Sequence, residues 1–172
     1  MKKLRHLSNK NKQIDREFYE TIRDILHHPA VQQMRIYMQH SGTNCYEHCL
    51  HVAYFNYRIC RRLHLDARSA ARAAMVHDLF LYDWRTHKFQ TGDATHAFTH
   101  PRTAYNNAKR YFDFSEKEEE IITKHMWPVT IVPPKHPETY VIVFTDKFCG
   151  FCEFLDYYFG PLREEYRKIN KL

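Results

Sequence analysis

The residues of this sequence best suited to chemistry are four histidines and two aspartates that lie far apart along the chain. The set is His48, His77, Asp78, His100, His125 and Asp146. Imidazole and carboxylate together suit a borderline-to-hard divalent ion such as Mn, Fe, Ni, Co or Mg, whereas thiolates more often surround structural zinc. These residue types therefore predict a metal centre, provided that the fold brings them together.

Each of these side chains also has an ordinary structural explanation. A single histidine on an inner helix face is more often a hydrogen-bonded core residue than a ligand. Asp146 is harder to explain in this way, because it lies in a largely apolar segment and a buried carboxylate is costly unless it is paired or bound to a metal. Its ordinary partner would be Lys147 or an arginine from another helix. The order of the whole set favours the metal, since every member falls on a predicted inner face or at the end of an element.

The element that must present His77 and Asp78 is an alanine-rich run that begins at Asp66. Asp66 is a good N-cap, and alanine is the best helix former. Neighbouring positions on a helix point about 100° apart, so His77 and Asp78 can share an ion only at a helix end, where other elements bring the remaining ligands. The run predicts a helix over 66–78 that ends at this pair.

Apolar spacing and capping signals predict the other helices, and the class is therefore all-α, a single bundle-like domain over 12–172. His48 lies on the inner stripe of one of them, and Ser115 begins another with a capping-box pattern. The strand-like run after Tyr140 repeats its large apolar residues at three and four, which favours a buried helix. The predicted ranges are 14–27, 31–39, 46–63, 100–112, 115–125, 140–155 and 162–169, and Pro101 is expected at a first helical position.

Two segments are expected to lie outside this bundle. Residues 1–11 are basic and polar and are predicted to form a loose N-terminal tail. Residues 79–99 are predicted to form a long loop, and loops of this length are usually functional or mobile. His96 within that loop, and His51, less than a turn from His48, rank below their neighbours as ligands.

Composition and charge restrict the setting and the partners. A formal net charge of +6, with 13 histidines uncounted, favours anionic partners. No apolar run is long enough for a membrane span, and the N-terminus lacks the apolar core of a secretion signal. Five cysteines are an odd number, which favours reduced thiols and a cytoplasmic location. Cys149-Gly-Phe-Cys152 resembles half a zinc site or a redox dithiol, but there is no second pair, and a buried structural pair is favoured.

At its candidate ligands the chain resembles the HD-domain metal-dependent phosphohydrolase superfamily. The matching motifs are Tyr-Glu-His48-Cys-Leu-His-Val-Ala, Ala-Ala-Met-Val-His77-Asp78 and a distant Asp146-Lys147, over about residues 45 to 150. The resemblance implies an HD-type helical fold in which His48, His77, Asp78 and Asp146 bind one ion. Some branches add two histidines and a second ion, and His100 and His125 occupy those positions here.

The activity that the resemblance implies is hydrolysis of a phosphate ester of a nucleotide or another small phosphorylated metabolite, with two metal ions expected. Two ions about 3.5–4 Å apart polarise a phosphoryl oxygen and lower the pKa of a bridging water. Asp78 is expected to bridge the ions, since a carboxylate offers two oxygens. Asp83 is a candidate general acid or base, although it is equally well explained as a turn residue.

The chain departs from the branches that follow the His-Asp pair with glycine and lysine, because it continues Leu79-Phe-Leu-Tyr-Asp83-Trp84. Another group must then hold the phosphate. The candidates are Arg102, Lys147, Arg85 and Lys88, of which Arg85 and Lys88 are also explained as solvated surface charges. Two other functions stay open at this point: a non-catalytic metal- or nucleotide-binding sensor, and a basic helical protein that binds nucleic acid. The scattered basic residues speak against the second.

Overall fold

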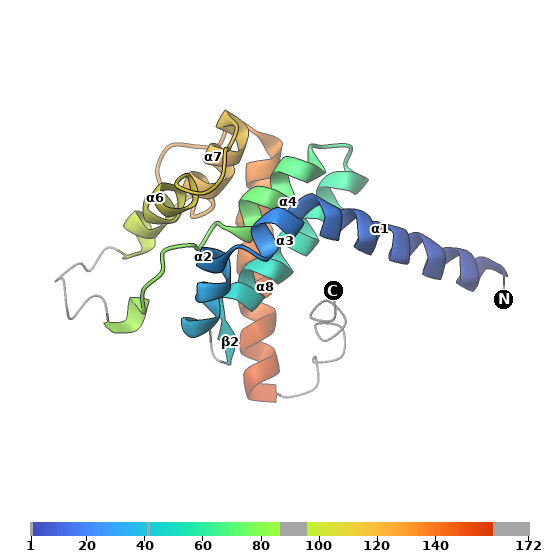
Figure 1. Cartoon of the computed structure of the whole chain (residues 1–172), viewed down its shortest axis with the longest axis horizontal. Coiled ribbons are helices and arrows are strands. Elements are labelled where there is room, and N and C mark those ends of the chain that lie inside the picture. Colours follow the sequence, from blue (N-terminus) through green and yellow to red (C-terminus); the bar gives the residue numbers. More distant parts are fainter. Residues whose placement is uncertain (1, 41, 87–95, 160–172) are drawn as a thin grey trace.

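Helix α3 (Cys45–Arg62) is the element around which the other helices pack, chiefly α4 (Ala67–Met75) and α8 (Pro137–Phe159) (Figure 1). The Asn44 side chain caps α3 by accepting from the backbone N–H of Glu47 at 2.9 Å. Acidic Glu47 in the first turn and basic Arg61 and Arg62 in the last complement the helix dipole. Helix α3 therefore follows the predicted helix over 46–63 closely, with His48 fully buried.

The computed structural model describes the backbone of residues 2–40, 42–86 and 96–159, and side chains at 12–39, 42–86 and 96–158. Its elements are mostly helices, as the sequence predicts for an all-α domain. In chain order they are α1 (Lys2–Leu26), α2 (Pro29–Gln32), the 3-10 helix η1 (Gln33–Ile36), β1 (Met38–His40), β2 (Thr43–Asn44), α3, α4, α6 (His96–Ala108), α7 (Glu116–Lys124) and α8. Among these described elements, no helix has the length and hydropathy needed to cross a bilayer.

The alanine-rich helix α4 forms as predicted. Asp66 accepts from the backbone N–H of Ser69 at 3.0 Å, which satisfies one donor of the first turn. The alanines at positions 70, 71, 73 and 74 are completely buried, and side chains of this size let α3 approach closely. The helix ends at Met75, so His77 and Asp78 lie in the turn that follows it.

Helices α7 and α8 also confirm their predictions. Ser115 accepts from the backbone N–H of Glu118 while the Glu118 carboxylate accepts from the Ser115 N–H, which is a complete capping box. The run after Tyr140 is helical, and α8 begins three residues earlier than expected, at Pro137. A proline is well tolerated at this first position, where its missing N–H would have no helical partner.

Two predicted ranges are wrong. The helix expected over 31–39 ends at Ile36, because Tyr37 is extended (φ −99°, ψ 127°) and leads into β1, which pairs antiparallel with β2. Gly42, with φ 87°, has the left-handed conformation that favours glycine in such a connection. Helix α6 begins at His96, before the predicted start at His100, so Pro101 lies inside the helix and removes one backbone hydrogen bond.

The ends of the chain differ from expectation to different degrees. Helix α1 begins at Lys2 and not near Ile14, so residues 2–11 are the first part of this helix and not the loose tail that was expected. Figure 1 shows this end of α1 projecting away from the other helices. The domain boundary at residue 12 stays a prediction. Within the expected loop, residues 84–86 form a helical turn. Residues 87–95 and the helix predicted over 162–169 lie outside the described residues.

Candidate metal centre

The six predicted ligands lie in one cluster between α3, α6, α7, α8 and the turn after α4, and four of them, Asp78, His100, His125 and Asp146, line a pocket. His48 Nε2 lies 3.0 Å from Asp146 Oδ1, and His77 Nε2 lies 3.6 Å from the same oxygen. His77 Nε2 is also 3.5 Å from Asp78 Oδ2. Side chains from α3, from the turn after α4 and from α8 thus present ligand atoms to one another.

A second group continues from the first through Asp78. Asp78 Oδ1 lies 3.2 Å from His100 Nε2 and 3.6 Å from His125 Nε2. The ligand atoms of His48, His77 and Asp146 lie within 4.8 Å of one another, and so do those of His77, Asp78 and His125. His77 belongs to both groups, and Asp78 reaches towards His77 with one oxygen and towards His100 and His125 with the other.

The ring nitrogen Nδ1 of three of these histidines is held by a backbone carbonyl on the side away from the pocket. His77 Nδ1 donates to Ala74 O at 2.7 Å, His100 Nδ1 to His96 O at 2.8 Å, and His125 Nδ1 to Ile122 O at 2.8 Å. A proton on Nδ1 leaves the lone pair of a neutral imidazole on Nε2. Hydrogen bonds of this kind orient histidine ligands in metal sites and fix their tautomer.

This arrangement leaves buried acceptors facing one another. His77 Nε2 and Asp78 Oδ1 are buried and accept no hydrogen bond from any of the described residues. His100 Nε2 and His125 Nε2 lie 2.9 Å apart although backbone carbonyls hold the protons of both rings on Nδ1. Closely packed lone pairs without donors are unfavourable unless a cation lies among them. The donor set therefore fits one or more divalent ions, with nitrogen and carboxylate ligands.

The electrostatics of the pocket point the same way. Burial alone lowers the pKa of His48 and His77, but the carboxylates beside them more than offset this and raise both pKa values well above normal. Burial raises the pKa of Asp146, yet the neighbouring imidazoles of His48 and His77 hold it well below its usual range. Burial and the neighbouring His77 and His100 lower the pKa of His125 to about 3. The pocket therefore attracts positive charge strongly at the His48–Asp146 side.

Two residues that support the ligands were missed from the sequence. Glu153 faces His48 Nδ1 at 3.0 Å with one oxygen and His51 Nδ1 at 3.2 Å with the other. Gln39 donates to Asp78 Oδ2 at 2.5 Å. Glu153 follows Asp146 by seven positions and therefore lies on the same helical face, a signal that was available. The sequence contained no such signal for Gln39, because the strand that carries it was predicted to be a helix.

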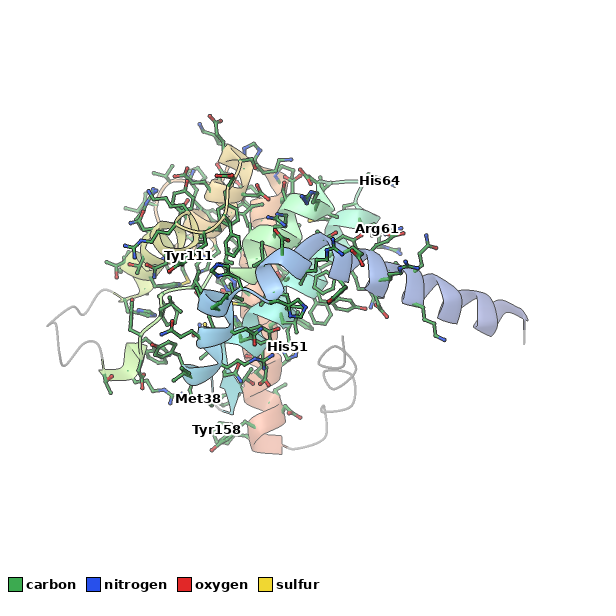
Figure 2. The ribbon with its side chains drawn as sticks, in the orientation of Figure 1. Met38, His51, Arg61, His64, Tyr111 and Tyr158 are labelled. Carbon is green, nitrogen blue, oxygen red and sulfur yellow. The ribbon has the colours of Figure 1, made fainter. Side chains whose placement is uncertain are left out.

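The pocket has a volume of about 390 Å³, and Lys147, Trp84 and His96 contribute to its wall. Lys147 is the one predicted phosphate ligand among the described residues that lines it. His96, which ranked below its neighbours, stacks on His100 with ring centroids 4.6 Å apart. His51, the other low-ranked histidine, contacts Glu153 and is labelled in Figure 2.

Three other predicted site residues, Arg102, Arg85 and Asp83, are not part of the pocket lining. Arg102 pairs with Glu119 at 3.0 Å, and Arg85 is exposed beside Trp84. The carboxylate of Asp83 is exposed and accepts from the backbone N–H of Arg85 at 2.9 Å, as a turn residue does. Lys88 lies outside the described residues.

The cysteines are weaker ligand candidates than the histidines and aspartates. All five are free, and Cys45 and Cys49 lie within ligand reach of Asp78. Burial raises the pKa of both thiols, and it also raises that of Cys149. Protonated thiols are poorer ligands than neutral imidazoles or carboxylates, and the buried structural pair expected at Cys149–Cys152 stays a prediction.

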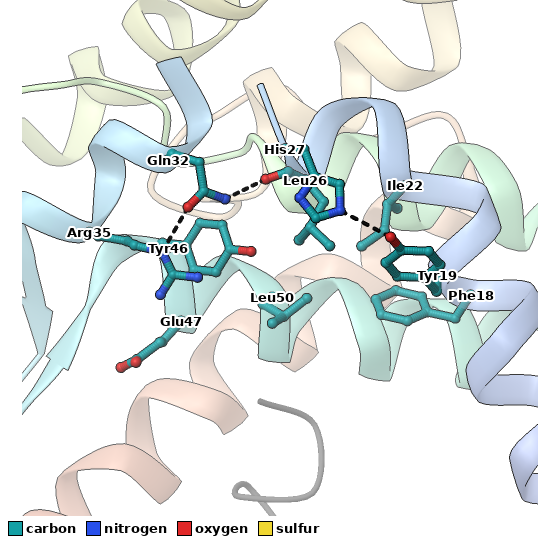
Figure 3. A pocket seen from close by; sticks show the side chains of 10 residues that line it. All are labelled: Phe18, Tyr19, Ile22, Leu26, His27, Gln32, Arg35, Tyr46, Glu47 and Leu50. Carbon is teal, nitrogen blue, oxygen red and sulfur yellow. Dashed lines mark hydrogen bonds between the residues drawn. The ribbon is translucent and has the colours of Figure 1, made fainter. Parts of the chain in front are cut away.

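A second hollow, of about 350 Å³, lies between α1 and the start of α3 (Figure 3). Arg35 stacks there over the ring of Tyr46, 3.7 Å from its centroid. His27 and Tyr19 share a hydrogen bond of 3.0 Å in its wall. None of the ligand groups found among the described residues lies in this hollow, so the pocket at Asp78 is the candidate site.

Comparison with known proteins supports part of this assignment. No family model matches the chain, and no solved structure matches it. One match is YueE of Bacillus subtilis (strain 168), whose name proposes it as a phosphohydrolase; it is 35% identical over 66 residues. The match covers 38% of this chain and 34% of YueE, about a third of each protein. Over that part of its length, the chain is distantly similar to a protein whose name proposes a phosphohydrolase.

Proposed function

We propose that the protein is a metal-dependent phosphohydrolase of the HD superfamily that binds two divalent ions. The observation that carries the proposal is the set of imidazole Nε2 atoms directed at two carboxylates, with each Nδ1 held by a partner behind it. The partial similarity to YueE supports the reaction class. The substrate that fits is a phosphate ester of a nucleotide or another small phosphorylated metabolite, since the pocket holds about 390 Å³.

In this proposal His48, His77 and Asp146 would hold one ion, and His100 and His125 the other. Asp78 would serve both, because its two oxygens face the two groups. When bound, Mn, Fe, Ni, Co or Mg ions would polarise a phosphoryl oxygen and lower the pKa of a water molecule. Gln39 would keep one oxygen of Asp78 in place, and Glu153 would do the same for the ring of His48.

The remaining roles belong to the pocket wall. Lys147 is exposed at the rim, where its ammonium group would attract the phosphate of a substrate. The net charge of +6 favours an anionic substrate in the same way. Asp83 stays a candidate acid or base, and Arg102, Arg85 and Lys88 stay candidates for contacts that a bound substrate would bring closer.

The proposal is tested by assaying the protein, loaded with Mn²⁺, Mg²⁺, Co²⁺, Ni²⁺ or Fe²⁺, on a panel of phosphomonoesters, phosphodiesters and nucleotides. We expect turnover that a chelator abolishes and that Asp78→Asn reduces to background. Glu20→Gln, an equivalent change at an exposed carboxylate paired with Arg23, is the matched control and should retain full activity.

Two results would contradict the proposal. Metal bound at this pocket without hydrolysis of any phosphoester would favour a metal- or nucleotide-binding sensor. Strongly salt-dependent binding of DNA or RNA that a chelator leaves unchanged would favour a nucleic-acid-binding protein with structural histidines.

A further inference from the structure

Helix α8 carries an aromatic stripe on the side opposite the metal-site carboxylates. The stripe consists of Tyr140, Phe144, Phe148, Phe151, Phe154 and Tyr158, each between 42% and 61% exposed. Ring contacts connect neighbouring members, with centroids of Phe144 and Phe148 5.9 Å apart and of Phe154 and Tyr158 4.6 Å apart. Figure 2 shows Tyr158 at the end of α8 that extends beyond the other helices.

The other side of α8 already packs on the protein core. Ile142, Thr145 and Cys149 are completely buried there, and Asp146 and Glu153 face the metal centre. Helix α8 is therefore apolar on its outer side as well as its inner side. A large exposed apolar face usually marks an interaction site, so this outer side is expected to be covered in the working protein.

The exposed area of the stripe is sufficient for a stable interface. A fully exposed aromatic side chain offers about 200 Å², so six half-exposed rings leave about 600 Å² on each copy. This is at the upper end for the largest apolar patch of a typical monomer, about 300–600 Å². Two such stripes packed together would bury at most about 1,200 Å², at the lower limit of specific protein interfaces.

The spacing of the stripe identifies the occupant as another helix. Five members of the stripe form a repeat when Lys147 is counted in place of Phe148. The spacings are four, three, four, three and four residues along Tyr140, Phe144, Lys147, Phe151, Phe154 and Tyr158. This seven-residue repeat is the pattern with which two helices pack along their length, and the single charged residue within it, Lys147, can fix the register. Lys147 lies at the pocket rim, so its alkyl stem can pack in the stripe while its ammonium group stays in water.

The repeat has the same residue types when it is read forwards and backwards (Tyr, Phe, then Phe, Tyr), except at its central pair, Lys147 and Phe151. In an antiparallel pair of α8 helices centred at residue 149, Tyr140 of one copy meets Tyr158 of the other, and Phe144 meets Phe154. At the centre the alkyl stem of Lys147 packs against Phe151. We propose that the protein forms a homodimer through the aromatic stripe of α8, with the two helices antiparallel and related by a two-fold axis.

Charges introduced at Phe144 and Phe154, which meet in this interface, test whether the stripe forms the dimer and whether the two helices are antiparallel. Sedimentation equilibrium should find the wild type as a dimer at micromolar concentration. The double variant F144E/F154E places glutamates opposite one another and should weaken association by about a hundredfold. F144K/F154E carries the same number of charges but places lysine opposite glutamate, and should regain most of the lost affinity.

The direction of packing is decided by the difference between the two double variants. In a parallel pair the lysines introduced at position 144 of the two copies would face one another, and F144K/F154E would associate as weakly as F144E/F154E. Ile131→Glu, at a 92% exposed side chain outside the stripe, is the matched control and should leave the dimer intact. Circular dichroism confirms that each variant stays helical. A wild type that is monomeric up to about 100 μM, or a dimer that F144E/F154E leaves unchanged, overturns the proposal.

Discussion

At the scale of single residues, the candidate centre depends on which nitrogen each imidazole presents. Backbone carbonyls of Ala74, His96 and Ile122 hold Nδ1 of three histidines, and Glu153 holds that of His48. Each carbonyl acceptor comes from the helical segment that leads to its histidine, three or four residues earlier. The local helix geometry therefore orients each ligand before any ion binds, which reduces the cost of assembling the site.

Removing one ligand of the group formed by Asp78, His100 and His125 should abolish binding of one ion and leave binding of the other unchanged. We expect His125→Ala to bind one equivalent of Mn²⁺ where the wild type binds two, because His48, His77 and Asp146 keep their geometry. Elemental analysis after equilibrium dialysis measures the ratio. His27→Ala, at a histidine hydrogen-bonded to Tyr19 away from the pocket, should bind as the wild type does. A wild-type ratio of one would exclude the second ion.

Glu153 is expected to act on metal binding through His48. Glu153→Gln keeps the size of the side chain but removes the charge that faces His48 Nδ1 and His51 Nδ1. Changes of this kind typically weaken metal binding by about 10–100-fold. Isothermal titration with Mn²⁺ measures the effect, and Glu20→Gln is the control. Unchanged affinity in Glu153→Gln would contradict this role of Glu153.

At the scale of elements, Glu120 of α7 fixes the start of the helix that carries Asp146 and Glu153. Its Oε1 accepts from the backbone N–H groups of Lys135 and His136 at 2.9 and 2.8 Å and from the Thr139 hydroxyl at 3.1 Å. Burial raises the pKa of Glu120, but these hydrogen bonds outweigh it and leave the pKa below its usual value. The carboxylate is therefore preferred in the folded protein.

A lowered pKa in the folded state makes this contribution dependent on pH. It is fully present above the normal pKa of a glutamate in the unfolded chain and is lost as pH falls through the lowered folded pKa. We expect Glu120→Gln to reduce the free energy of unfolding at pH 7 by about 1 kcal/mol and to flatten its decline in acid. Urea unfolding at several pH values, with Glu20→Gln as the control, measures both. An unchanged acid profile would contradict the role of Glu120.

The elements that could be predicted from the sequence are those whose signals are local. Asp66, Ser115 and the buried alanines of α4 specify helix ends and close packing within a few residues, and His48 lies on a clear apolar stripe. The hairpin near Gly42 was missed, because the apolar residues before it also fit a helical spacing. The contact between Gln39 and Asp78 joins residues far apart in the chain, and only the assembled fold brings them together.

At the scale of the whole molecule, the buried lone pairs of the pocket link metal binding to stability. An ion that binds only the folded state stabilises it by about 2.7 kcal/mol at a concentration 100 times its Kd. For a chain of this size that corresponds to a rise in Tm of roughly 5–10 °C. We expect Mn²⁺ to raise the Tm of chelator-treated wild type by this amount in differential scanning calorimetry. His77→Ala should show no such rise, whereas an equal rise in His77→Ala would place the ion elsewhere.

The most direct test is a crystal structure of the Mn²⁺-loaded protein with anomalous diffraction recorded at the manganese edge. We expect two anomalous peaks in the pocket, one beside Nε2 of His48 and His77 with Asp146, the other beside Nε2 of His100 and His125. Asp78 should contact both. Peaks at other places on the molecule, or a pocket without anomalous density while manganese is bound elsewhere, would contradict the two-ion centre.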